Sequence, residues 1–347
     1  DTEKDIETPS SYFRHLIIDT YEKYHKPVVI LIDEYDKPLL DNIDKTEFAK
    51  EVWEFLSGLY SIIKSNSQYV KFVFITGISK FAKAGIFSGL NMLEDITLSP
   101  DFGNICGYRQ EDVEELLKEY NANVDYDEVK EWYNGYYWLK DRLYNPFDLL
   151  RFIKNNYEYE DYWFSTGTPS FLIKLIEKNN YYLPQLSNLK IEKSSLEKYN
   201  VEKVNLNVLL FQSGYLTIKE VEYDEYEENQ IYKLGFPNKE VRKSFNTHII
   251  EQIYNDETLI NRKLNKAFHE FDLEKVEEIL KSLFSSIPYN NYVNNTIFEY
   301  EGYYSSVIFV YLQAMGYEII GEDVTNRGRI DLTLLHRKAI YLFEFKV

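Results

Sequence analysis

Two groups of acidic residues, one toward each end of the chain, have the types and spacing that bind magnesium. In the first group, Asp33 and Glu34 directly follow the aliphatic run VVILI. In the second, Asp331 lies in GRIDLTLL, and Glu344 and Lys346 lie in IYLFEFK. Carboxylate oxygens are the ligands that magnesium prefers, and a lysine beside them can orient water or stabilise charge that develops on a phosphate. Both groups therefore predict chemistry on phosphates.

The aliphatic run at residues 28–32 predicts a strand buried on both faces, as in the centre of a parallel sheet. Because such a strand has no side facing solvent, its acids must lie at its carboxyl end, where open α/β sheets bind ligands. This is the Walker B arrangement, in which Asp33 holds magnesium in a nucleotide site and Glu34 orients the attacking water. An ordinary strand with an acidic turn is the alternative. We interpret Asp36 as a structural acid that anchors the turn.

The next elements predict a βαβ unit. Apolar residues recur with a helical period over residues 48–63, and the run YVKFVFIT at residues 69–76 predicts a second strand, parallel to the first. Thr76 and Ser79 then lie at the same sheet edge as Asp33, where a polar side chain can sense the terminal phosphate of a nucleotide. A threonine at the end of a strand is also common by chance.

A hairpin is the simplest arrangement of the C-terminal segments. If four residues from His336 to Ala339 close it, Leu335 pairs with Ile340, and counting outward places Asp331 opposite Glu344. Two acids directly across a hairpin repel each other unless a cation joins them. The pairing therefore predicts a cation site.

Two further acids lie close to this hairpin in the sequence. Residues 298–315 predict a helix, and Glu301 falls on its apolar stripe with Tyr304 and Ile308, where a carboxylate needs a partner. Glu322 is a weaker candidate for the site, and we favour its interpretation as a surface charge.

Several sequence blocks resemble the AAA-ATPase-like family of bacterial proteins. The blocks follow one another in order and span roughly half of the chain. They are LIDEYDKP, FITGISKFAKAGIFSGLNMLEDITL, ICGY, WYNGYYW, YNPFDLL and YWFSTGTPSFLIKLI. The resemblance implies a P-loop NTPase core that binds ATP or another NTP with magnesium, followed by helical and winged-helix-like parts.

The C-terminal segment resembles the core of the PD-(D/E)XK nucleases. By that resemblance Asp331, Glu344 and Lys346 are catalytic, the two acids bind magnesium, and Glu301 matches an extra metal-binding acid on the preceding helix. An E-x-K pattern alone is weak, because strand ends often carry alternating charges. The combination with Asp331 and Glu301 is more specific.

The sequence departs from the ATPase pattern in one respect. No glycine is followed by lysine, so the phosphate-binding loop G-x-x-x-x-G-K-[ST] is absent, and 27 residues precede Val28. We expect either that the chain is an N-terminally truncated piece or that it does not hydrolyse nucleotide. It begins with Asp1 rather than methionine, and the nuclease-like core needs further strands and a helix after Val347.

Composition limits the partners. The net charge is −18, which disfavours non-specific binding of nucleic acid, whereas residues 325–347 hold five basic residues against two acids, a local charge of 5 − 2 = +3. We therefore expect nucleic acid at the C-terminal domain and a protein partner at the acidic segment 220–229. The single cysteine excludes a disulfide framework and a thiolate zinc site, and the five scattered histidines have no metal-ligand spacing. With no bilayer-spanning run and no leader, we expect a cytoplasmic protein without membrane contact.

These observations predict an α/β protein with three regions. Residues 1–110 form an AAA-ATPase-like core, a partial P-loop parallel sheet without its Walker A half. Residues 111–290 form a helical and winged-helix-like region, which includes helices over 245–260 and 264–284. Residues 291–347 form an incomplete restriction-endonuclease-like α/β core.

Three functions are consistent with this organisation. The first is an NTPase-regulated, metal-dependent nuclease. The second is a nucleotide-switched signalling or scaffold protein whose nuclease-like domain is catalytically silent. The third is a structural protein in which both sites are degenerate. The sequence leaves the choice between DNA and RNA and the oligomeric state open.

Overall fold

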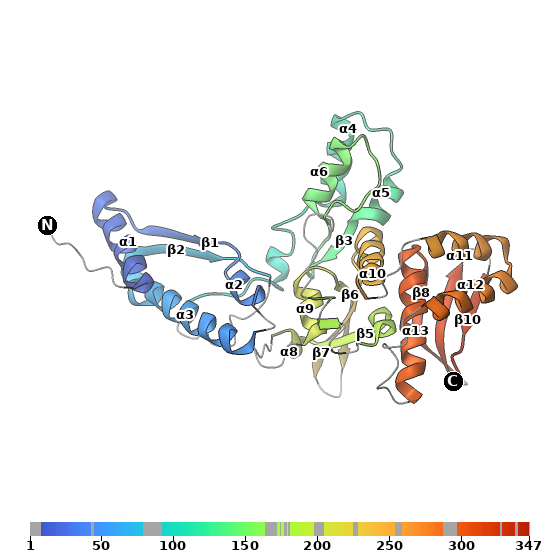
Figure 1. Cartoon of the computed structure of the whole chain (residues 1–347). Helices are drawn as coiled ribbons and strands as arrows, with labels where there is room; N and C mark the ends of the chain where they lie inside the picture. The colour runs from blue at the N-terminus through green and yellow to red at the C-terminus, as the bar shows by residue number, and fades with distance from the viewer. Residues whose placement is uncertain are drawn as a thin grey trace. The chain divides into compact units, whose positions relative to one another are not determined.

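The computed structural model describes most of the chain, and it divides into two compact units. The units are residues 1–96 with 192–213, and residues 97–191 with 214–347 (Figure 1). The described residues are 8–42, 45–78, 92–163, 172–173, 175–176, 179, 181–197, 205–224, 228–253, 259–286, 297–326, 328–336 and 339–346. Among them, no helix combines the length and apolar character needed to cross a bilayer. The predicted division at residues 110 and 290 stays a prediction.

The first unit contains a short parallel sheet with helices. Its elements are α1 (Pro9–Tyr24), β1 (Val28–Ile32), α2 (Lys37–Leu40), α3 (Thr46–Ser65), β2 (Val70–Ile75), α8 (Lys193–Glu197) and α9 (Leu206–Gln212). Helix α1 begins because the Thr8 side chain accepts a hydrogen bond from the Ser11 N–H at 3.2 Å, and it ends at His25 in the left-handed conformation. Strands β1 and β2 pair in parallel, with Ile32 opposite Ile75, as predicted. The larger P-loop sheet stays a prediction.

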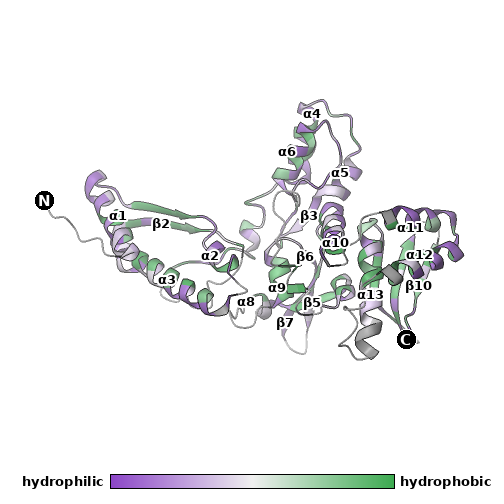
Figure 2. Ribbon diagram, in the orientation of Figure 1, coloured by the Kyte–Doolittle hydropathy of each residue, from purple (hydrophilic) through white to green (hydrophobic). Residues whose placement is uncertain are grey.

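The prediction that β1 is buried on both faces is wrong for the described structure. Ile30 is buried, but Leu31 is 70% exposed, and the same open face carries three other large apolar residues, Val29, Phe72 and Phe74. Figure 2 shows both strands coloured as hydrophobic. Helix α1 packs against β1 and α3, but no described element covers the other face of the strand pair.

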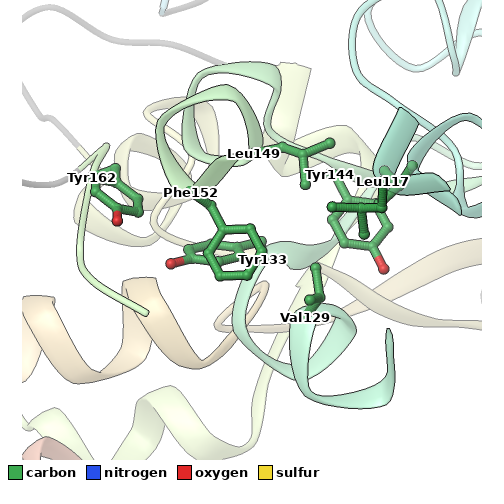
Figure 3. Close-up of a cluster of buried hydrophobic side chains, with 8 residues drawn as sticks. Leu117, Val129, Tyr133, Tyr144, Leu149, Phe152 and Tyr162 are labelled. Carbon is green, nitrogen blue, oxygen red and sulfur yellow. The ribbon is translucent and has the colours of Figure 1, made fainter. Parts of the chain in front are cut away.

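The second unit begins with helices around an aromatic core. Its first elements are α4 (Gln110–Glu119), α5 (Tyr126–Tyr133), β3 (Asn134–Tyr137), β4 (Arg142–Tyr144) and α6 (Pro146–Lys154). Buried side chains from all of these except β3 pack together, and Figure 3 shows Tyr133 and Phe152 at the centre of the cluster. Their ring centroids are 5.5 Å apart. These aromatic side chains therefore form part of the buried core of this unit.

The middle of the second unit is a small sheet in the order β5-β7-β6, in which β6 and β7 pair antiparallel. Its elements are β5 (Leu189–Glu192), β6 (Thr217–Asp224) and β7 (Asn229–Gly235). A winged-helix-like region was predicted here. The chain order of α9, β6 and β7 is a helix followed by a hairpin, while the winged helix as a packed unit stays a prediction. The acids of the hairpin are partly paired, because Glu222 lies 2.6 Å from Lys190.

The C-terminal part surrounds a buried helix with helices and a second antiparallel sheet. The elements are α10 (Lys239–Ile253), α11 (Leu259–Glu270), α12 (Leu273–Ser286), α13 (Ile297–Ala314), β8 (Glu318–Thr325), β9 (Gly328–His336) and β10 (Ala339–Phe343). Residues 305–314 of α13 are buried on every side of the helix, where α10, α11, β8 and β9 contact it. The single helix predicted over 264–284 is wrong. Phe271 has a left-handed backbone, and Asp272 caps α12 by accepting a hydrogen bond from the Lys275 N–H at 2.9 Å.

A short strap connects this part to the segment before β5. The 3-10 helix η5 (Leu183–Ser187) contacts both β8 and α13. The Gly321 N–H donates to the Ser187 hydroxyl at 2.8 Å, and a Cβ on Gly321 would lie 2.5 Å from the carbonyl oxygen of Pro184. The strap therefore needs a glycine at this point of β8.

We predict that Gly321→Ala destabilises the second unit by about 1–3 kcal/mol, because the new methyl group forces the strap away from β8. The matched control is Gly328→Ala in β9, where a Cβ meets no atom within 4 Å. Thermal unfolding of both variants measures the difference. Equal unfolding temperatures for the two variants would contradict the close packing of the strap.

A buried pair of acids gives the second unit a predicted pH dependence. Asp148 and Glu240 are both 0% exposed, and Glu240 accepts a hydrogen bond from the Trp163 N–H at 2.9 Å. Burial raises the pKa of Asp148 from 3.8 to about 6. The folded chain therefore holds this proton more tightly than the unfolded chain. The stability from this group is fully present below about pH 4 and is lost as the pH rises through about 6.

We predict that Asp148→Asn removes this loss, because an amide of the same shape stays neutral. The variant gains on the order of 2–3 kcal/mol relative to the wild type between pH 4 and pH 7. Urea unfolding at a series of pH values measures it, with the exposed Asp161→Asn as control. Parallel pH profiles for Asp148→Asn and the wild type would refute the prediction.

Candidate functional site

The N-terminal acids lie where the carboxyl ends of two parallel strands meet. The Thr76 hydroxyl donates a hydrogen bond to Asp33 Oδ1, and the Glu34 N–H donates to the same oxygen at 3.0 Å. Thr76 is held in place because its N–H donates to the Ile32 carbonyl at 2.8 Å. The structure thus brings Asp33 and Thr76 together as the sequence predicted. Ser79 lies outside the described residues.

Glu34 and Asp36 differ in their surroundings. Glu34 is exposed and has a left-handed backbone, with φ 51°. Asp36 is 0% exposed, precedes α2, and accepts a hydrogen bond from the Ile78 N–H at 3.2 Å. A Cβ on Gly77 would lie 2.6 Å from Asp36 Oδ1, so the two strand-end loops approach closely. Asp36 therefore anchors the turn, in agreement with the interpretation from sequence.

The C-terminal hairpin has the predicted register. Ile340 pairs with Leu335, and the pairs continue to Phe343 with Leu332, so the next position of the count places Glu344 across from Asp331. The Phe345 N–H donates to Asp331 Oδ2 at 2.8 Å, which ties Asp331 to the segment that carries Glu344. Glu344 and Lys346 are exposed, and Asp331 is half-buried.

Glu322 is a third acid beside Asp331 and Glu344, and its interpretation as a surface charge was wrong. In the register of β8 with β9, Gly321 pairs with Leu332 and Asp323 with Ile330, so Glu322 lies opposite Asp331. Glu322 is not a solvated surface charge, because its side chain is 27% exposed and ion-paired with Arg329. Its backbone is left-handed, with φ 55°. The alternation of side chains along β8 could have placed Glu322 beside Asp331, but the pairing of β8 with β9 was not predicted from the sequence.

Tyr182 completes this side of the site, and sequence reasoning missed it. Its hydroxyl donates to Glu322 Oε1 at 2.6 Å and lies 3.3 Å from the Ser305 hydroxyl of α13. Burial raises the pKa of Tyr182 well above its ordinary value, and the nearby Glu322 and Asp331 charges raise it further. No sequence pattern links Tyr182 to a residue 140 positions later. Only the strap brings it to the sheet.

Glu301 lies in α13, and its side chain is outside the described part of the structure. Its backbone lies one helical turn before Ser305. Between them, a Cβ on Gly302 would lie 3.5 Å from the Tyr182 ring. The helix turn that carries Glu301 therefore borders the same site. The side-chain position of Glu301 stays a prediction.

The residues of the C-terminal site are chemically suited to a hard divalent cation. Asp331 on β9 and Glu344, directly after β10, supply carboxylate oxygens, and one oxygen of Asp331 is used by the Phe345 N–H, which leaves the other for a metal. Among the described residues, no three His, Cys, Asp or Glu side chains form a metal-binding group by themselves. The donor type fits magnesium, and Glu301 is the candidate for a further ligand.

Comparison with known proteins gives two family matches. Residues 1–87 match a family described as predicted AAA-ATPases, and residues 299–347 match the PD-(D/E)XK nuclease superfamily. A protein of Azotobacter chroococcum mcd 1, described as an uncharacterized protein in the vnfD 5' region, is 38% identical to this chain over 338 residues. The alignment covers 96% of this chain and 65% of that protein, so the chain spans 65% of the relative's length. No solved structure matches the chain.

The matched segments coincide with the two acidic sites. The first contains β1, β2, Asp33 and Thr76, and the second contains the sheet β10-β9-β8 with Asp331, Glu344 and Lys346. The chain therefore carries a segment similar to predicted AAA-ATPases, at residues 1–87, and a segment similar to the PD-(D/E)XK nuclease superfamily, at residues 299–347.

Proposed function

We propose that the C-terminal site cleaves phosphodiester bonds of nucleic acid with a divalent metal ion, and that nucleotide bound by the N-terminal segment regulates it. The observation that carries the proposal is the hairpin register, whose count continues to Asp331 across from Glu344, together with the hydrogen bond from the Phe345 N–H to Asp331. Two acids in this arrangement repel each other in the absence of a cation. The match of residues 299–347 to a nuclease superfamily supports the same chemistry.

Each residue has a defined role in the proposal. Asp331 and Glu344 would hold magnesium, which when bound polarises the phosphate and activates water. Lys346 would orient the attacking water or stabilise the charge that develops on the phosphate. The local charge of 5 − 2 = +3 over residues 325–347 would attract the substrate to a chain that is otherwise acidic.

The regulatory part of the proposal rests on the first unit. Asp33 would hold magnesium beside ATP or another NTP, Glu34 would orient water, and Thr76 would sense the terminal phosphate. The hydrogen bond from Thr76 to Asp33 supports this arrangement, because it couples the ends of two strands at one edge. The match of residues 1–87 to predicted AAA-ATPases supports it independently.

We predict that the chain cleaves DNA or RNA in magnesium and that Lys346→Ala lowers the rate about 10²-fold or more, because a group that stabilises transition-state charge is lost. Gel electrophoresis of labelled substrates measures cleavage. The control is Lys281→Ala on α12, an exposed lysine paired with Glu277. No cleavage by the wild type, or equal cleavage by Lys346→Ala, would exclude the nuclease activity.

We predict that the chain binds magnesium–ATP and that Asp33→Asn weakens this binding about tenfold, because a neutral amide is a poorer ligand for the metal. Calorimetry measures the affinity, with Asp41→Asn, an exposed acid paired with Lys37, as control. Absence of binding by the wild type would remove nucleotide control from the proposal and leave the nuclease part untouched.

A further inference from the structure

We propose that Arg329 binds a substrate phosphate in the C-terminal site, and that Glu322 and Tyr182 are the positioning residues that aim it. The inference rests on the proposed nuclease function and names the group that recognises the substrate. It concerns three residues to which neither the motif D-(x)n-E-x-K nor the family matches give a role.

Arg329 lies on the same face of β9 as Asp331. The two residues are two positions apart in one strand, so their side chains point to the same side of the sheet, roughly 7 Å apart. Continuing the count of the hairpin beyond its last pair, Lys346 falls across from Arg329, as Glu344 falls across from Asp331. Three acids, Glu322, Asp331 and Glu344, therefore lie across from one another. The two cations Arg329 and Lys346 lie beside them. A metal-bound phosphodiester needs this neighbourhood of opposite charges.

Glu322 fixes the direction of Arg329. Arg329 Nη1 lies 2.5 Å from Glu322 Oε2, while the other oxygen of Glu322 accepts the Tyr182 hydroxyl at 2.6 Å. Both carboxylate oxygens are thus in use, so Glu322 is held at two points. The Arg329 side chain is 54% exposed. Because a guanidinium has five N–H donors, donors remain on its exposed side for a phosphate.

A surface ion pair for stability alone is a weaker explanation. Such pairs contribute typically no more than about 1 kcal/mol, and they do not need a half-buried tyrosine to hold the acid. Here Tyr182, directly before the strap η5, contacts Glu322, and three other contacts hold Tyr182 and the strap in place. Its ring faces Gly302, its hydroxyl is 3.3 Å from Ser305, and Ser187 of the same strap accepts the Gly321 N–H.

The test measures nucleic-acid binding by the full chain with calcium in place of magnesium, which separates binding from cleavage. Labelled single-stranded and duplex DNA and RNA are titrated at several salt concentrations. Arg329→Ala should weaken binding about tenfold and reduce the slope of log affinity against log salt by about 0.7–0.9, the value for one phosphate contact. Arg329→Lys should recover the slope, because it keeps the charge. The control is Arg262→Ala, an exposed arginine on α11, which should retain the wild-type slope.

The positioning role has its own readout. Tyr182→Phe and Glu322→Gln should each weaken binding, but neither should add to the effect of Arg329→Ala in a double variant, because both act through the arginine. A merely structural tyrosine gives additive losses instead. Circular dichroism confirms that each variant is folded.

The outcomes separate this inference from the proposed function. If the wild type binds and cleaves but Arg329→Ala keeps its affinity and salt slope, Arg329 is not a phosphate ligand and the inference is overturned. Additive double variants overturn the positioning role of Tyr182 and Glu322. If the wild type binds none of the four substrates, the proposed function fails, and the inference fails with it.

Discussion

The pairing of β9 on both of its edges is the constraint on which the C-terminal site depends. Asp331 is brought to Glu322 by the register with β8 and to Glu344 by the register with β10. Because side chains alternate along a strand, a slip of one residue on either edge would turn an acid to the other face. The register is fixed by burial, since Leu332 and Leu334 are 0% exposed on the opposite face of the strand. The apolar side of β9 therefore holds the polar side in place.

Burial of α13 is the second requirement, and it explains how a distant segment enters the site. The helix is enclosed by α10, α11, two strands and the strap η5. Gly302 and Gly321, one on the helix and one on β8, are the points where the strap comes close. The absence of a side chain at the two glycines leaves room for Tyr182 and Pro184. The polar contact of Tyr182 with Glu322 thus depends on apolar packing around it.

The N-terminal site follows a simpler rule. Parallel strands end at the same edge, so a polar residue at the end of β2 meets an acid at the end of β1 without any further device. The hydrogen bond between Thr76 and Asp33 is the direct result. Asp36 shows the contrasting case, because it is fully buried and its oxygen is used by a backbone N–H of the neighbouring loop. Of the three acids in this short segment, Asp33 and Glu34 are thus exposed, whereas Asp36 is buried and anchors the turn.

The sequence by itself determined the elements whose cause is local. The strands at both sites, the parallel pair, the hairpin register and the meeting of Asp33 with Thr76 follow from periodicity and from counting along adjoining strands. Tertiary structure decided the features that depend on packing between distant segments. The exposure of Leu31 depends on which elements cover β1, and the break at Phe271 depends on a single left-handed residue that periodicity does not reveal. The role of Glu322 and the arrival of Tyr182 depend on a contact across 140 residues, and no local pattern encodes such a distance.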